Sequence, residues 1–231
     1  MNEGRARRPA PVVAIDGPAG VGKSTAARLV ARRLGFTLVD TGALYRAVAL
    51  ASEERGIEQH NGQALSRVAQ DVDIELGQRA DGSTKVVIDG VDRSDDIRRH
   101  EISMRASTVS KHPEVRQALL GLQRELGKEG GVVLEGRDIG TVVFPDAEVK
   151  VFLTASPEVR ARRRYEELVG RGDDVSFDDV LADVVSRDHQ DETRSVAPLR
   201  AADDAVVLDS SKLDVEGVVS RVLELVEAGS S

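Results

Sequence analysis

The segment GPAGVGKS, residues 17–24, has the residue types and the spacing of a loop that binds the phosphates of a nucleotide. Its glycines let the backbone approach a phosphate chain closely, with the N–H groups pointing toward it. The ammonium group of Lys23 could reach the outer phosphates, and the hydroxyl group of Ser24 could bind Mg²⁺. The apolar run VVAID before the loop is typical of a buried strand, and STAARLVARRL after it has helical periodicity. The pattern therefore predicts a nucleotide site, and a surface loop that matches by chance is the alternative.

We expect the phosphates of ATP to be held by a continuous stretch of residues, comprising Gly17, Pro18, Ala19, Gly20, Val21, Gly22, Lys23, Ser24 and Thr25. Asp16 directly precedes this loop and is a candidate for ordering water molecules around a Mg²⁺ ion bound to Ser24. A short polar side chain at this position could instead form a hydrogen bond that caps the loop or a helix. The sequence leaves both interpretations of Asp16 open.

The composition excludes several classes of site and partner. The 231-residue chain contains no cysteine, which excludes disulfides, thiolate metal sites and a cysteine nucleophile, and its four histidines lack the spacing of metal ligands. The formal net charge of −8 argues against nucleic acid or an anionic membrane as a partner. No apolar run approaches the roughly 18 residues that a membrane span needs. We therefore expect a cytoplasmic protein, with a flexible basic tail at residues 1–11 rather than a signal peptide.

Apolar runs alternate with helical patterns along the chain. Five runs are typical of strands, at residues 12–16, 36–40, 132–136, 149–155 and 205–209. Periodicity predicts helices at 24–34, 43–56, 156–169, 177–192 and 214–229, with two more between 94 and 126, the second starting at Pro113. This alternation predicts the α/β class, with a parallel five-stranded sheet of the P-loop NTPase type and helices on both faces. Ligands should bind beyond the carboxyl ends of the strands, where Asp16, Asp40 and the segment 135–138 lie.

Residues 71–94 interrupt this alternation. Short alternating runs, separated by the turn signals ADGS and Asp89-Gly90, predict a small antiparallel β insert there. The core nucleotide-binding domain should then comprise residues 12–70 and 95–231. Within it, the helix from Ser156 and the polar loop that follows predict a helical lid at residues 156–176.

The motifs narrow the class of nucleotide-binding protein. A guanine-nucleotide switch would need N-K-x-D late in the chain, and SKLD at residues 211–214 lacks the Asn. ATP-driven motors and small-molecule kinases remain, and the length and acidic composition favour a kinase. An anionic acceptor would need cations near the carboxyl ends of the strands, and the candidates are Arg46, Arg116, Arg137, Arg187 and Arg194. Spacings of three and four put Arg160, Arg163 and Arg164 on one side of their helix, where they could face one anion or form a solvated basic face.

Five stretches of the chain resemble bacterial cytidylate kinases, in the same order: IDGPAGVGKST, DTGALYRAVA, EGRDIGTVVFPDA, RDHQDETRSVAPL and ADDAVVLDSS. The phosphate loop alone is generic, whereas the second and third stretches are much more specific. The resemblance runs from about Val12 to the end of the chain. It implies a monomeric enzyme that transfers the γ-phosphate of ATP to CMP or dCMP and uses Mg²⁺.

The resemblance also implies roles for individual residues. Sugar, base face and acceptor phosphate would be contacted by Thr41, Tyr45 and Arg46. The cytosine edge would be read by Ser107, Arg116 and Asp138, and the sugar would face Arg187 and Asp191. The transferred phosphoryl group would be stabilised by Lys23, Arg137, Arg194, Arg160 and Arg164. The insert would extend the nucleoside monophosphate side, the lid would cover ATP, and residues 209–213 would flank the adenine.

Two departures and several alternatives remain. Thr41 stands where some relatives carry Ser, and this exchange keeps the hydroxyl group. Glu135 stands where some relatives carry Asp, and its extra methylene could move any carboxylate that reaches the Mg²⁺ water shell. Tyr45 also fits the apolar face of its helix, and Ser107 could simply cap a helix. The protein as a whole could be a kinase for another small acceptor, such as UMP or shikimate, or a regulatory ATPase that transfers phosphate to no acceptor.

Overall fold

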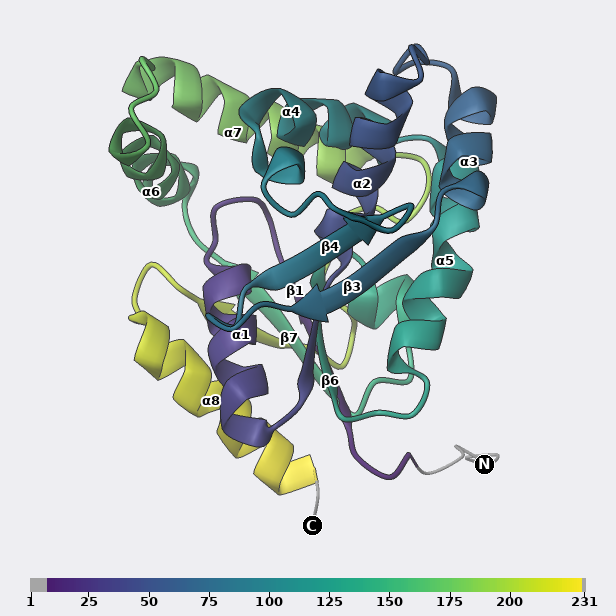
Figure 1. Cartoon of the computed structure of the whole chain (residues 1–231). Coiled ribbons are helices and arrows are strands. Elements are labelled where there is room, and N and C mark those ends of the chain that lie inside the picture. Colours follow the sequence, from purple (N-terminus) through teal and green to yellow (C-terminus); the bar gives the residue numbers. More distant parts are fainter. Residues whose placement is uncertain (1–7, 230–231) are drawn as a thin grey trace.

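The computed structural model describes residues 8–229 of the chain, which form two sheets surrounded by helices (Figure 1). The larger sheet has five strands in the order β2-β6-β1-β7-β8. They are β1 (Val12–Asp16), β2 (Thr37–Asp40), β6 (Val132–Gly136), β7 (Val149–Thr154) and β8 (Val206–Asp209). Every neighbouring pair is parallel, so all carboxyl ends meet at one edge. The predicted α/β class and parallel five-stranded sheet are confirmed.

Alternating side chains of β1 explain why helices cover both faces of this sheet. Val13 and Ile15 pack on one side against α1 (Lys23–Leu34) and α8 (Val215–Gly229). Val12 and Ala14 point to the opposite side, toward the short π-helical segment η2 (Ile139–Val143) and α5 (Pro113–Gly127). Successive residues of a strand point to opposite faces, so a continuous apolar run requires a cover on each face.

A second hydrophobic core is formed by helices from the middle of the chain and by the smaller sheet. It contains the fully buried side chains of Leu44 and Leu50 from α2 (Thr41–Glu54) and Ile102 from α4 (His100–Val109). It also contains α3 (Gly62–Asp71), a helix that the sequence patterns did not predict. The local features that favour α3 are the Asn61 side chain, which caps the helix by accepting a hydrogen bond from the Ala64 N–H at 3.1 Å, and buried apolar residues at 65, 68 and 69.

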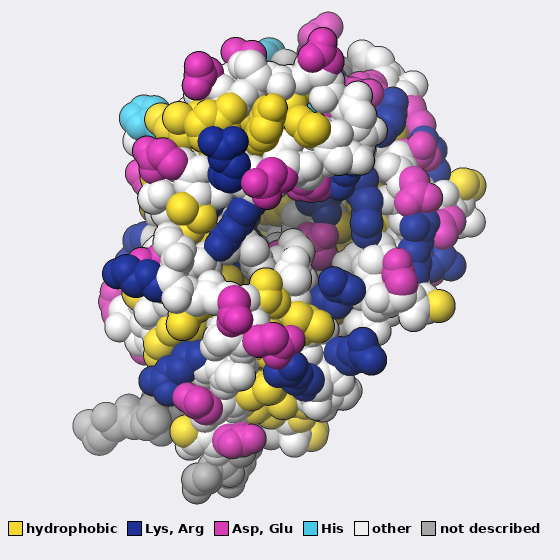
Figure 2. Space-filling model, turned by 90° about the vertical axis from the view of Figure 1, so that its left-hand side faces the viewer, with side chains coloured by type: hydrophobic (Ala, Val, Ile, Leu, Met, Phe, Trp, Pro, Cys, Tyr) yellow, Lys and Arg dark blue, Asp and Glu magenta, His cyan; other side chains and the backbone are white. Residues whose placement is uncertain are grey.

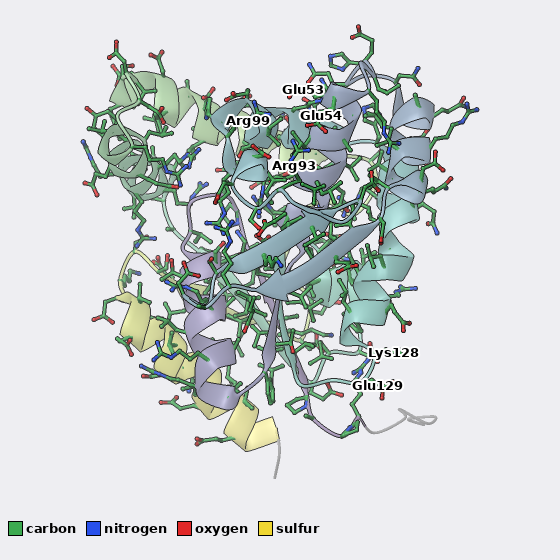
Figure 3. The ribbon with its side chains drawn as sticks, in the orientation of Figure 1. Glu53, Glu54, Arg93, Arg99, Lys128 and Glu129 are labelled. Atoms are coloured by element: carbon green, nitrogen blue, oxygen red, sulfur yellow. The ribbon has the colours of Figure 1, made fainter. Side chains whose placement is uncertain are left out.

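The smaller sheet is the antiparallel insert predicted at residues 71–94. It consists of β3 (Ile74–Gln78), β4 (Thr84–Ile88) and β5 (Val91–Asp92). Asp89 and Gly90 both have positive φ, at 49° and 80°, as the two-residue turn between β4 and β5 requires. Figure 3 shows how the segment after β5 is tied to α2, with Arg93 beside Glu54 and Arg99 beside Glu53. A 3₁₀ turn, η1 (Asp96–Arg98), then leads into α4.

Two helices form a separate small layer near the carboxyl edge of the large sheet. They are α6 (Pro157–Gly170) and α7 (Phe177–Thr193), and they correspond to helices predicted from the sequence (Figure 1). Their shared apolar cluster contains Ala161, Leu168, Val180 and Val184. Because this cluster is separate from the cores around the sheets, it can hold the two helices together as a unit.

The beginning of the described chain is held against the core. Arg8 pairs with Asp146 at 2.5 Å and with Glu148 at 2.9 Å, and its guanidinium lies 5.4 Å from the centre of the Phe144 ring. Residues 1–7 of the tail predicted at 1–11 lie outside the described residues. Among the described helices, none is long and apolar enough to cross a membrane.

Candidate active site

The loop between β1 and α1 has the backbone geometry of a phosphate-binding loop. Gly17 has φ of 147°, and a Cβ at this position would lie 2.3 Å from the carbonyl oxygen of Leu153, so a side chain cannot be accommodated. Gly22, at φ of 96°, immediately precedes the first residue of α1. The N-terminal N–H groups of α1 therefore point at the space enclosed by the loop, where they and the helix dipole favour an anion.

Lys23 is the buried cation of this loop. Its Nζ donates a 2.7 Å hydrogen bond to the carbonyl oxygen of Pro18, and its side chain is almost inaccessible to solvent. Burial, and then the nearby charge of Arg137, hold the pKa of Lys23 well below its usual range. Negative charge at the loop would oppose both effects and favour the ammonium form, which is what a polyphosphate would provide.

Ser24 and Glu135 meet where two neighbouring strands end. The Ser24 hydroxyl donates a 2.8 Å hydrogen bond to Glu135 Oε2. Burial, and then the charge of Asp40, raise the pKa of Glu135 to about 7. Asp40 also forms an ion pair with Arg46 at 2.6 Å. Ser24 was predicted as a Mg²⁺ ligand, and Glu135 was considered near the Mg²⁺ water shell without being assigned a role. The pairing of Ile15 with Glu135 in adjacent strands explains the position of this carboxylate.

The oxygen atoms of Ser24 and Glu135 are of the kind that coordinate Mg²⁺. The ion prefers oxygen ligands and is usually held by one or two protein groups, with waters and substrate phosphates completing its shell. Ser24 supplies a hydroxyl oxygen and Glu135 a carboxylate oxygen. Within residues 8–229 there is no group of three or more His, Asp or Glu side chains that could hold a metal by themselves. A site that depends on substrate phosphates needs no such group.

Asp16 is engaged with the segment after β6. Its two carboxylate oxygens accept hydrogen bonds from the backbone N–H groups of Ile139 at 2.9 Å and Gly140 at 2.8 Å. Burial raises the pKa of Asp16 to about 6, although these two hydrogen bonds act in the opposite direction. The carboxylate thus holds the first turn of η2, which corresponds to the capping interpretation of this residue.

A network of arginines and aspartates lies beyond the ends of β1 and β6. Arg116 pairs with Asp138, and both side chains are 7% exposed. Arg137 Nε is 2.9 Å from Asp191 Oδ2. Arg194 lies between the two aspartates, with nitrogen–oxygen separations of 3.9 Å to Asp138 and 3.7 Å to Asp191. Three guanidinium groups therefore face two carboxylates, and the network carries an excess of positive charge.

Several of these guanidinium groups retain buried nitrogen atoms without a hydrogen-bond partner among the described residues. The atoms are Arg46 Nε, Arg187 Nε and Arg194 Nη2. Burial, and then the charge of Arg137, lower the pKa of Arg187 to about 10. Leaving a buried donor without an acceptor costs about 1–3 kcal/mol, and more for a charged group. Donors of this kind from α2 and from α7 with its C-cap indicate a site for an anion that supplies the missing acceptors.

The residues predicted to contact base and sugar lie around this network. The Arg116 guanidinium is 5.4 Å from the centre of the Tyr45 ring, which is almost completely buried among core residues. The Thr41 hydroxyl donates a 2.7 Å hydrogen bond to the backbone carbonyl of Glu135. Ser107 accepts hydrogen bonds from Gln190 Nε2 at its hydroxyl and its carbonyl oxygen, both at 2.9 Å. Gln190 was not predicted, although it lies between Arg187 and Arg194 in the motif RDHQDETR.

The three lid arginines of α6 have different environments. Arg160 is buried and bonded to protein acceptors on all sides, including a bidentate contact with Asp188. Arg163 donates to the Val21 carbonyl at 3.3 Å and to Ser210. Arg164 donates a 2.9 Å hydrogen bond to Glu167, one turn further along the same helix. Arg160 and Arg164 were both predicted to stabilise the phosphoryl group. Arg160 is buried, whereas the hydrogen bond of Arg164 lies at the protein surface.

Figure 2 shows the face of the molecule beside α6 and α7. Lys and Arg side chains gather around a hollow in this face, although the chain as a whole carries a net charge of −8. The structure therefore brings together the phosphate loop, Glu135 and the arginine network at the carboxyl edge of the sheet, where ligands of open α/β sheets bind.

Comparison with known proteins agrees with this arrangement. The family model for cytidylate kinase matches residues 13–228. A cytidylate kinase of Syntrophotalea carbinolica is 49% identical over 215 residues, which cover 93% of this chain and 91% of the relative. A cytidylate kinase of Geobacter sulfurreducens is 51% identical over 215 residues, covering 93% and 92%. A crystal structure of an uncharacterised protein from Eubacterium ventriosum shares the fold, with a TM-score of 0.52 and 12% identity over 94% of this chain and 98% of that one.

Proposed function

Because the chain belongs to the cytidylate kinase family, we propose that it transfers the γ-phosphate of ATP to CMP or dCMP, giving ADP and CDP or dCDP. The observation that carries this proposal is the group of buried guanidinium nitrogens that lack a hydrogen-bond partner among the described residues, beside a phosphate-binding loop. The loop suits the phosphate chain of the donor, and the arginines suit a second, separate anion. Two anionic sites at one edge of the sheet are what a transfer between two nucleotides requires.

The donor side would bind ATP through the loop at residues 17–25. Backbone N–H groups and Lys23 would hold the phosphates, while Ser24 and Glu135 would hold Mg²⁺. When bound, Mg²⁺ would neutralise charge on the phosphates of ATP. We further propose that the lid, residues 156–176, closes over ATP and keeps water from the γ-phosphate, with Arg164 contributing positive charge.

The acceptor side would bind the monophosphate through the arginine network. Its phosphate would lie among Arg46, Arg137 and Arg194, and its sugar would face Arg187 and Asp191, with Thr41 and Tyr45 completing the site. The insert would extend this side of the protein. An acceptor phosphate oxygen would then attack the γ-phosphorus as the bond to the β-phosphate oxygen breaks. In-line transfer of this kind needs positioning and charge neutralisation rather than a covalent intermediate or an essential general base.

Recognition of cytosine would depend on Arg116 and Asp138. Arg116 has only hydrogen-bond donors, which suit cytosine N3 and O2, and the ionised carboxylate of Asp138 has only acceptors, which suit the N4 amino group. Their ion pair holds the two groups side by side in a buried position. Ser107 would add a contact that does not decide the identity of the base, since a hydroxyl can either donate or accept.

An assay of ADP release tests this function directly. The purified protein is supplied with ATP, Mg²⁺ and, in turn, CMP, dCMP, UMP or shikimate, and the phosphorylated product is identified by mass spectrometry. We expect release that depends on CMP or dCMP and exceeds that with UMP or shikimate. ADP release that is independent of any acceptor would instead identify an ATPase. We also propose a monomer that acts in the cytoplasm, which the assay does not address and sedimentation and localisation would test.

A further inference from the structure

The ion pair between Asp188 on α7 and Arg160 on α6 lies next to the phosphate loop. Arg160 Nη1 is 2.8 Å from Asp188 Oδ1, and Arg160 Nη2 donates to Oδ2, so the contact is bidentate. The side chain of Arg160 is 3% exposed and that of Asp188 is 15% exposed. Asp188 therefore compensates the charge of the buried Arg160 guanidinium.

The same guanidinium group holds the backbone of the phosphate loop. Arg160 Nη1 donates a 3.2 Å hydrogen bond to the carbonyl oxygen of Ala19, and Nε donates to the carbonyl oxygen of Ala155 at 2.9 Å. The loop is also packed against Arg160, since a Cβ at Gly20 would lie 3.1 Å from its carbonyl oxygen and 3.2 Å from its Cβ. Arg160 thus connects the start of the lid with the first half of the loop.

Holding this carbonyl oxygen also orients a phosphate-binding group. The Ala19 carbonyl and the Gly20 N–H belong to one planar trans peptide unit, in which the C=O and N–H bonds point in opposite directions. A carbonyl directed at Arg160 therefore turns the Gly20 N–H away from the lid helix. Without Asp188, Arg160 would be a buried, uncompensated cation, and the geometry of its contact with Ala19 would relax.

We propose that Asp188 is a positioning residue for ATP, which acts through Arg160 to hold the Ala19–Gly20 peptide in its phosphate-binding orientation. The inference rests on the proposed role of the loop as the ATP site and is independent of the identity of the acceptor. It assigns a different task to Arg160 from the direct phosphoryl contact expected from the sequence. It also means that α7 serves both substrates, since Arg187 and Asp191 of the same helix lie on the acceptor side.

The test is the affinity for ATP, measured by titration calorimetry without any acceptor. The variants are Asp188→Asn, Arg160→Gln and the double variant, with Asp183→Asn as a control because Asp183 is exposed on the same helix. We expect Asp188→Asn to weaken ATP binding about tenfold, which corresponds to about 1.4 kcal/mol of binding free energy. The control should bind ATP like the unmodified protein.

The double variant distinguishes a positioning role from a merely structural one. If Asp188 acts through Arg160, the double variant should bind ATP no more weakly than Arg160→Gln alone, because contacting residues are not additive. It also removes both buried charges, so it should fold even where a single variant does not. Multiplicative losses, or unchanged ATP affinity in folded Asp188→Asn despite a lowered melting temperature, would each overturn the proposal. If the unmodified protein binds ATP but does not phosphorylate CMP, only the proposed function fails.

Discussion

The hydroxyl of Ser24 donates a 2.8 Å hydrogen bond to Glu135, although 111 residues separate the two in the chain. Ser24 lies in the first turn of α1, directly after the phosphate loop, and Glu135 is the penultimate residue of the neighbouring strand β6. Their adjacency follows from the parallel pairing of β1 with β6, which places both carboxyl ends at one edge. The pair forms the oxygen-rich corner of the site, where the proposed Mg²⁺ would bind.

Replacement of Glu135 should therefore weaken the requirement for Mg²⁺ specifically. Glu135→Gln keeps an acceptor for the Ser24 hydroxyl but removes the negative charge. We expect the Mg²⁺ concentration that gives half-maximal turnover to rise about tenfold or more, the scale of losses around metal ligands. Titration of Mg²⁺ at saturating ATP and CMP measures this, with Glu129→Gln as a control on an exposed residue of the loop before β6. An unchanged Mg²⁺ dependence would remove Glu135 from the metal site.

Loss of the Lys23 side chain should strongly reduce turnover. The ammonium group of Lys23 is buried and directed at the loop, so no bulk solvent lies beside it that could take over its role. We expect Lys23→Ala to lower kcat by at least ~100-fold, the scale seen when one preorganised donor is removed from a reacting centre. Steady-state kinetics would measure this effect. Lys128→Ala, at a side chain that is 54% exposed, provides the control, and near-normal turnover of Lys23→Ala would contradict the assigned role.

Substitutions in the lid should affect turnover rather than substrate affinity, because the lid would act after both nucleotides are bound. Arg164→Ala should lower kcat while the affinity for CMP, measured by calorimetry, stays close to that of the unmodified protein. Arg162→Ala removes a positive charge from the same helix, but its guanidinium lies over the Phe177 ring, 4.2 Å from the ring centre. It should therefore leave kcat largely unchanged. A large loss of CMP affinity with intact turnover would separate Arg164 from the lid function.

Contacts at the start of the described chain predict an effect on stability alone. Arg8 bridges Asp146 and Glu148, and its side chain is 14% exposed while those of its partners are 45% and 27% exposed. Partly exposed ion pairs contribute little, so Arg8→Ala should lower the free energy of unfolding by about 1 kcal/mol, as measured by urea denaturation. Arg55→Ala is the control, since its pair with Asp89 is 3.6 Å long and both side chains are at least 40% exposed. Equal effects of the two changes would show that the Arg8 contacts add nothing.

The sequence predicted those parts of the protein that depend on local patterns. The loop at Gly17 and the apolar run before it are contiguous, and the alternation of strands and helices implies the parallel sheet. The contact of Arg160 with Asp188 was not predictable in this way, because it depends on how α6 and α7 pack. The engagement of Asp16 with η2 likewise requires the arrangement of β1 beside β6, since the sequence alone allowed two roles for its carboxylate.

The buried pair of Arg116 and Asp138 leads to a prediction about base selectivity. Uracil presents O4 as an acceptor and N3–H as a donor, the reverse of cytosine N4 and N3. Asp138 would then meet an acceptor and Arg116 a donor. Each frustrated group costs ~1–3 kcal/mol, and more when charged, so the two together could discriminate several hundred-fold.

Asp138→Asn should narrow the preference for CMP over UMP in kcat/KM, because the new amide supplies a donor that can face uracil O4. Its activity on CMP should fall, since the substitution also removes the charge that compensates Arg116. Steady-state kinetics with both nucleotides measures the ratio, and thermal unfolding confirms that the variant is folded. Ser107→Ala serves as the comparison, since it should weaken both substrates to a similar degree. If Asp138→Asn, like Ser107→Ala, lowers kcat/KM equally for CMP and UMP, the carboxylate of Asp138 only shapes the turn after β6 and the base is read by other groups.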